Sequence, residues 1–170
     1  MTGPAHMSDP VLDSDEALAA FMQGFFDGTF PGKEWHHREH VIMAGWHLLR
    51  FSEAETIERT SEAIKRYNLS QGGQNTDSSG YHHTLTVLWV RIAGHALAQQ
   101  PMGLGERERL RLLADEYSAK TRLYQEYYSY DVVKSTAARL NWVEPDLRRL
   151  PEISGEPAQI SENRGASPPV

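Results

Sequence analysis

The stretch from about residue 81 to residue 99 is apolar on nearly every side of the helix that it predicts. Its middle reads LTVLWVRIAGHALA, in which Arg91 is the single formal charge. A helix of this kind is buried from all directions, as in the middle of a helical bundle. We therefore expect an all-α, single-domain fold in which the other helices surround this one.

Further segments carry helical periodicity or signals for a helix start, and no convincing strand pattern interrupts them. Capping boxes are predicted at Asp13 with Glu16 and at Ser52 with Glu55. Ser135 is expected to cap a short last helix that ends near Trp142. A bundle of five or six helices follows, with the fifth able to continue into the tyrosine-rich segment 124–130. The predicted helices cover about 13–27, 35–51, 52–68, 81–99, 106–117 and 135–142.

The two ends of the chain differ from the helical part. Residues 1–12 are predicted to be a flexible lead, 13–151 the helical domain, and 152–170 a disordered tail, because the tail is polar and rich in Pro, Gly and Ser. The first residues lack the charged start and apolar stretch of a secretory signal. Met7 is an alternative start to Met1.

Composition removes several classes of function. The chain has no cysteine, which excludes disulfides and thiolate chemistry. Its formal charge of −6 and the lack of a long basic stripe argue against nucleic acid as a partner. No apolar run reaches the roughly 18 residues of a membrane span. We expect a cytoplasmic protein, without a membrane partner, that binds a small molecule.

Five of the eight histidines lie in two short runs at the starts of predicted helices. The first run is WHHREH at 35–40, and the second is GYHHT at 80–84. Imidazole readily moves protons near neutral pH and is the commonest metal ligand. If the two runs face each other, they form a site between the predicted helices 35–51 and 81–99. The loop 69–80, rich in Gly, Ser and Asn, would cover that site.

One chemistry open to this site is metal binding. His37 and His40 are three apart on a helix, so their rings can converge, and His82 is the expected third ligand from the facing helix. His47 or Glu39 is a further candidate. Three histidines with an open position suit one divalent ion of zinc, iron, nickel or copper.

The other chemistry is metal-free, with one histidine as a general base. Tyr81, Glu39 or another histidine would orient that base or donate a proton, and His83 would support it. The remaining alternative is that these histidines are hydrogen-bonded core and capping residues without a catalytic role.

Residues near the two runs supply candidates for substrate binding. Tryptophans are typical pocket walls, and hydroxyl or guanidinium groups can hold polar substituents. Helix N-termini also attract anions, so a small polar or anionic metabolite is the expected ligand. For one candidate, Arg139, an internal pair with Asp146 or Glu144 is favoured over a ligand carboxylate. The candidates for substrate binding are Trp35, Asn68, Thr84, Trp89 and Arg139.

Four segments together resemble a family of short, largely uncharacterised bacterial proteins. The family pattern is approximately W-x-H-x-x-H, I-x-x-Y-N, G-Y-H-E-T-x-T-x-x-W, and Y-S followed by A-R-x-x-W-x-E-P-D-L-x-x-L-P. The resemblance spans about residues 21–151. The matching residues are Trp35, His37, His40, Ile64, Tyr67, Asn68, Gly80, Tyr81, His82, Thr84, Thr86, Trp89, Tyr128, Ser129, Ala138, Arg139, Trp142, Glu144, Pro145, Asp146, Leu147, Leu150 and Pro151.

The resemblance implies a small helical fold in which His37, His40 and His82 form the shared site. His83 stands where the family has Glu, so a role of that Glu as ligand or base would be changed or lost here. The resemblance also implies small-molecule tailoring in natural-product biosynthesis, such as elimination or ring closure, alongside a partner enzyme or as a homodimer. The alternative is a non-catalytic ligand-binding or accessory subunit of a biosynthetic enzyme.

Overall fold

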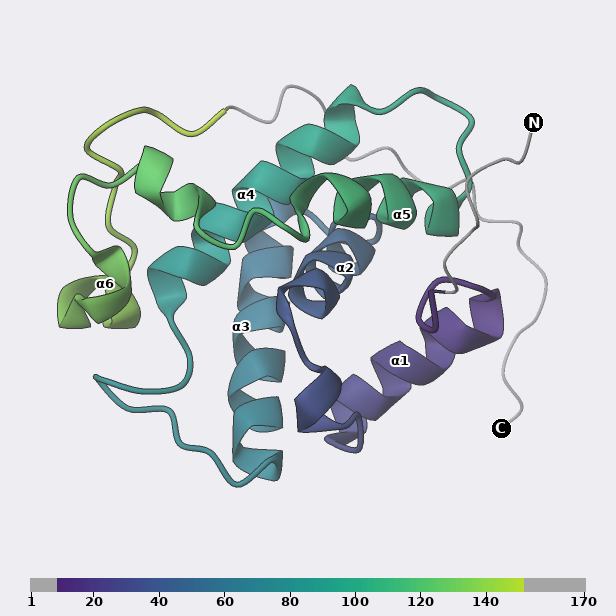
Figure 1. The fold of residues 1–170 in the computed structure, drawn as a ribbon, viewed down its shortest axis with the longest axis horizontal. Helices are drawn as coiled ribbons and strands as arrows, with labels where there is room; N and C mark the ends of the chain where they lie inside the picture. The colour runs from purple at the N-terminus through teal and green to yellow at the C-terminus, as the bar shows by residue number, and fades with distance from the viewer. Residues whose placement is uncertain (1–8, 152–170) are drawn as a thin grey trace.

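The computed structural model describes residues 9–151, and over that range the chain forms helices and no strands, as the sequence predicts. Figure 1 shows the six α-helices gathered in one bundle. They are α1 (Asp15–Asp27), α2 (His37–Leu48), α3 (Glu53–Ser70), α4 (His83–Gln99), α5 (Glu106–Tyr117) and α6 (Thr136–Leu140), with three short 3-10 helices, η1 (Gly32–Glu34), η2 (Leu123–Glu126) and η3 (Val132–Lys134).

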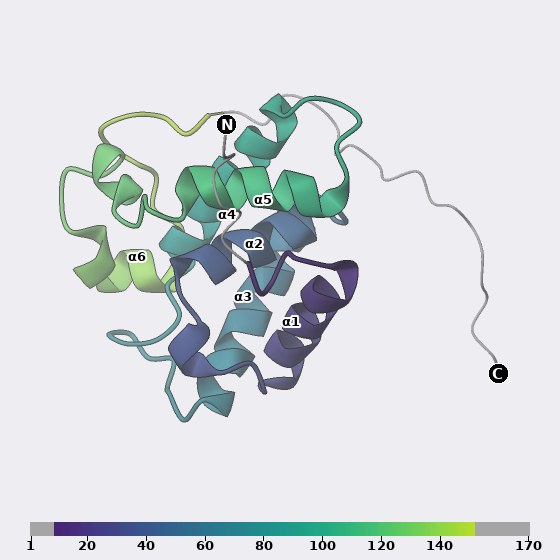
Figure 2. The ribbon, with the colours of Figure 1, turned by 45° about the vertical axis from the view of Figure 1, so that its right-hand side comes forward.

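Two helices share the centre of the bundle. α4 packs against α2, α3, α5 and α6, which confirms the prediction that the apolar stretch 81–99 is surrounded by other helices. α2 packs against α3, α4 and α5 (Figure 2). α2 approaches α5 closely at Gly45, where an added Cβ would lie 2.7 Å from a methyl group of Leu113.

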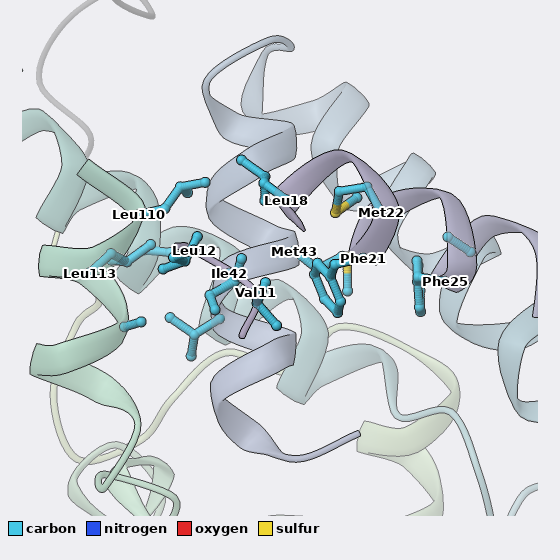
Figure 3. Packing of buried hydrophobic residues seen from close by; sticks show 14 of the residues in the cluster. Val11, Leu12, Leu18, Phe21, Met22, Phe25, Ile42, Met43, Leu110 and Leu113 are labelled. Atoms are coloured by element: carbon cyan, nitrogen blue, oxygen red, sulfur yellow. The ribbon is translucent and has the colours of Figure 1, made fainter. Parts of the chain in front are cut away.

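The folded part begins earlier than the sequence suggests. Residues 9–12 are predicted within the flexible lead, yet Leu12 is 0% exposed and lies among apolar residues of α1, α2 and α5 (Figure 3). Asp9 is buried too, paired with Arg38 and 3.6 Å from Arg111. Residues 9–12 therefore belong to the folded part, and the predicted boundary at residue 12 is corrected accordingly. The predictions for residues 1–8 and 152–170 lie outside the described residues.

Of the three helix caps that the sequence predicts, two are present in the structure. Ser52 with Glu55 forms the predicted capping box, with hydrogen bonds of 3.3 and 3.1 Å. Ser135 caps α6 as predicted by accepting from the backbone N–H of Ala138. The predicted cap at Asp13 is wrong, because Ser14 caps α1 and the Asp13 carboxylate accepts from the backbone N–H of Asp9.

The tyrosine-rich segment does not extend α5, which ends at Tyr117. Tyr127 and Tyr128 instead join a second apolar cluster that packs against Leu88 and Ile92 of α4. The chain after α5 therefore wraps around the outer side of α4 and covers its start. No helix within residues 9–151 is long and apolar enough to cross a membrane.

Candidate functional site

A cavity of about 600 Å³ lies between α2, α3 and α4. The predicted covering loop forms part of its wall, because five residues of the α3–α4 connection line it: Gln71, Gly73, Gln74, Ser79 and Gly80. Figures 1 and 2 show that connection on the same side of the bundle as α6. The sequence predicts the cavity's place between α2 and α4, whereas the contribution of α3 is additional. Its aromatic and apolar lining residues are Trp35, Val41, Met43, Ala44, Ile64, Tyr67, Tyr81, Leu85, Trp89, Val90 and Tyr124.

Trp35 is a fixed wall of this cavity. Its ring stacks on Phe25 with the ring centroids 4.7 Å apart, and it lies 5.0 Å from the ring of Tyr67. Tyr67 is held in turn, since its hydroxyl donates to the carbonyl of Phe30 at 2.8 Å. The aromatic wall is therefore set by packing with α1 and α3, so it is present before any ligand binds.

His37 is the first residue of α2 and presents an unpaired nitrogen. Its Nε2 is buried and has no hydrogen-bond partner among the described residues. The ring packs edge-on against Trp89 with centroids 4.4 Å apart. Burial lowers the pKa of His37, while a hydrogen bond with the backbone of Tyr117 opposes this. Because that bond favours the protonated ring, the ring is its donor.

His40 lies one turn further along α2 and is also neutral. Its Nδ1 lies 2.7 Å from the carbonyl of His36, and since a carbonyl only accepts, Nδ1 carries the proton. Its ring lies 4.1 Å from that of Trp35. Burial lowers the pKa of His40 to about 4. The lone pair of this ring is therefore on Nε2.

His82 lines the same cavity but has both ring nitrogens occupied. Nε2 donates to the carbonyl of Val132 at 3.0 Å, and Nδ1 accepts from the backbone N–H of Leu85 at 3.3 Å. His82 is the N-cap of α4, and burial lowers its pKa. No lone pair remains for a substrate proton or a metal ion, so the position is structural.

The predicted ligand set of His37, His40 and His82 does not fit a metal ion in this geometry. The two nitrogens of His82 are already bonded, as described above. Within residues 9–151, no three side chains of His, Cys, Asp or Glu are grouped so that they could hold one ion. His47 lies elsewhere, buried against Trp46 and Phe26.

Tyr81 and His83 belong to a chain of hydrogen bonds that ends at the carbonyl of Ile57. Because this carbonyl can only accept, it decides which group donates in each bond of the chain. The hydroxyl of Ser61 donates to the carbonyl of Ile57 at 2.6 Å, so its oxygen accepts from the hydroxyl of Tyr81 at 2.5 Å. The Tyr81 oxygen then accepts from Nδ1 of His83 at 2.9 Å. Burial raises the pKa of Tyr81. The proton of Tyr81 is therefore directed to Ser61 and is not available to a ligand.

Two of the predicted site residues serve backbone groups. Glu39, a candidate catalytic residue, accepts from the backbone N–H of His36 at 3.0 Å and so caps α2. Thr84, a candidate substrate-binding residue, donates to the carbonyl of Asn141 at 2.6 Å and accepts from the backbone N–H of Val143. Neither residue is part of the cavity wall.

Arg139 also lies outside the cavity wall, and it does not form the expected pair with an acidic residue. Its guanidinium donates to the carbonyls of Gly80 and Tyr81 at 3.0 and 3.3 Å, and to that of Val133 at 3.1 Å. Asp146 accepts instead from the backbone N–H of Ser129. Arg139 therefore fastens the start of α4 to the segment before α6.

Asn68 lines the cavity and fixes its covering connection. Its amide donates to the side-chain oxygen of Asn75 at 2.9 Å, and that oxygen also accepts from the backbone N–H of Tyr81. Asn75 further donates to the carbonyl of Lys65. The predicted cover is thus bound to α3 through Asn75, midway along its length.

Thr60 is a site residue that the sequence does not single out. Its hydroxyl is buried in the cavity region and has no hydrogen-bond partner in the described part of the chain. Thr56 and Thr60 lie four apart on the buried face of α3, and this spacing of two buried hydroxyl residues is the feature of the sequence that could have indicated them. Tyr124, from the segment after α5, reaches the cavity with no signal in the sequence.

Searches of protein-family models, of curated proteins and of solved structures found no match to this chain.

Proposed function

We propose that the protein is an enzyme that acts on a small molecule in this cavity, with His37 as the general base. The observation that supports this most directly is the buried, unpaired Nε2 of His37, a residue that lines the cavity. A buried polar atom without a partner costs free energy, so native proteins seldom keep one without a use. A neutral histidine at neutral pH is also in the right state to take a proton.

The surroundings of His37 suit proton abstraction. A substrate proton would pass to Nε2, and the resulting imidazolium would keep its hydrogen bond with the backbone of Tyr117, which favours the protonated ring. The apolar walls would keep water from the developing charge. The unpaired hydroxyl of Thr60 could donate to a substrate oxygen that becomes negative. These steps fit an elimination or a ring closure, the tailoring reactions that the family resemblance implies for natural-product biosynthesis.

A test of the base needs no knowledge of the natural substrate. 5-Nitrobenzisoxazole is an uncharged aromatic probe that loses a ring C–H proton to a base while its N–O bond breaks, which gives a coloured cyanophenolate. We expect turnover above that of free imidazole at equal concentration. His37→Phe should lower the rate at least tenfold, whereas His36→Ala, which changes an exposed neighbour, should keep it. Because burial lowers the pKa of His37, the rate should persist below pH 6.5.

The same experiment distinguishes the non-catalytic alternative. A ligand-binding or accessory protein would bind the probe in the cavity without speeding its conversion. Binding that quenches the fluorescence of Trp35 and Trp89, together with a rate that His37→Phe leaves unchanged, would contradict the catalytic proposal and favour that alternative.

A further inference from the structure

The described wall of the cavity carries no formal charge at neutral pH. Among the described residues that line it, none is Asp, Glu, Lys or Arg. The three histidines that line it are His37, His40 and His82, and burial lowers the pKa of each, so each ring is neutral. A charged ligand would lose its hydration here without gaining a counter-charge, which is costly in an apolar site.

The wall offers both hydrogen-bond donors and lone pairs. Its hydroxyl and amide groups include Thr60, Gln71, Gln74, Ser79, Thr121 and Tyr124, whereas the hydroxyl protons of Tyr81 and Thr86 are already given to Ser61 and to the carbonyl of His82. Nε2 of His40 carries a lone pair because Nδ1 of that ring holds the proton, and Nε2 of His37 has no partner among the described residues. A ligand that hydrogen-bonds to the lone pair of a neutral imidazole must present a donor, which is an O–H or N–H group.

The aromatic lining of the cavity favours a flat ligand. Besides the histidines, five aromatic side chains contribute to its walls: Trp35, Tyr67, Tyr81, Trp89 and Tyr124. Aromatic rings pack well on other rings in stacked or edge-on geometry. The volume of about 600 Å³ lies within the range of pockets that hold small organic molecules.

We infer that the substrate is an uncharged aromatic molecule with a hydroxyl or N–H group, and that Nε2 of His37 accepts a hydrogen bond from this group. The inference rests on the proposed function and narrows it to a substrate class. It replaces the sequence-based expectation of an anionic metabolite at the helix N-termini. At α4 that position is already taken, since His82 accepts from the backbone N–H of Leu85.

Four probes with one ring system separate charge from hydrogen bonding. They are 2-naphthol, 2-methoxynaphthalene, 2-naphthoate and 2-naphthylmethylammonium, titrated into the full chain by calorimetry at neutral pH. We expect 2-naphthol to bind at least tenfold more tightly than either charged probe. It should also bind about fivefold more tightly than its methyl ether, which has the ring but no donor. In His37→Phe the preference over the ether should disappear, whereas in His36→Ala it should remain.

The inference would be overturned if a charged probe bound as tightly as 2-naphthol, or if none of the aromatic probes bound. A preference over the ether that survived in His37→Phe would overturn the role of Nε2. The comparison of charges uses the wild-type chain, so it stands even if a variant does not fold. If the binding results contradicted this inference while turnover of the benzisoxazole still depended on His37, the proposed function would stand. If the naphthyl probes bound as expected but the benzisoxazole was not turned over, the proposed function would be contradicted and the inferred ligand class would not.

Discussion

Replacing His82 should destabilise the fold, because its ring joins two segments that are distant in sequence. It caps α4 through Leu85 and donates to the carbonyl of Val132 at 3.0 Å, and its residue is 7% exposed. In His82→Ala the carbonyl of Val132 loses the imidazole but keeps the backbone N–H of Ser135, so the lost hydrogen bond costs about 0.5–1.5 kcal/mol. The lost cap adds about 1 kcal/mol. The free energy of unfolding should therefore fall by about 1.5–2.5 kcal/mol.

A second substitution divides this effect into its parts. Asparagine is a favoured N-cap, so His82→Asn should keep the bond to Leu85, but it is too short to reach Val132. We expect a loss of about 0.5–1.5 kcal/mol, smaller than that of His82→Ala. His37→Phe removes an unpaired nitrogen and keeps a packed ring, but it also removes the hydrogen bond with the backbone of Tyr117, so the free energy of unfolding should fall by about 0.5–1.5 kcal/mol.

Urea unfolding followed by far-UV circular dichroism measures these differences, with His36→Ala as the control at an exposed histidine. Benzisoxazole turnover is measured on the same samples under native conditions. If His82→Ala unfolded like the wild type yet had lost turnover, His82 would be catalytic and the structural interpretation of its two hydrogen bonds would be refuted.

Three further predictions concern other parts of the molecule. Asp9→Asn weakens the buried pair with Arg38 and should lower the free energy of unfolding in urea by about 1–3 kcal/mol. In Gly80→Ala, the new Cβ would lie 2.0 Å from the carbonyl of Gln74, so calorimetry should show weaker 2-naphthol binding while circular dichroism shows unchanged helix content. His40 has a pKa of about 4 when folded and about 6.5 when unfolded, so the unfolded chain binds its proton first, and urea unfolding should show stability falling from pH 6.5 towards 4.

The features that the sequence predicts well are those decided within one helical turn. Ser52 with Glu55, and Ser135, cap helices through residues only three positions away. The choice of Ser14 over Asp13 as the cap of α1 could not be predicted in this way. Asp13 is engaged by the backbone of Asp9, which folds back because Leu12 is buried between helices.

The site shows the same division between local and distant effects. Periodicity and the two histidine runs predict that α2 and α4 meet, and His37, His40 and His82 do line one cavity. Which rings keep a lone pair depends on partners far along the chain. Val132, 50 residues after His82, occupies its Nε2, and Asn141 takes the hydroxyl of Thr84 in a similar manner. Hydrogen bonds to the C-terminal segment thus give His82 and Thr84, which the sequence predicts as site residues, a structural role.

The histidine at position 83 is compatible with the proposed role of His37 as the base. A carboxylate at this position could only accept, so it would draw the proton of Tyr81 toward itself. His83 instead donates to Tyr81, and the chain continues through Ser61 to the carbonyl of Ile57. Every proton in that chain is then committed to a neighbour. Among the cavity histidines, His37 has a ring nitrogen that is itself buried and has no partner among the described residues.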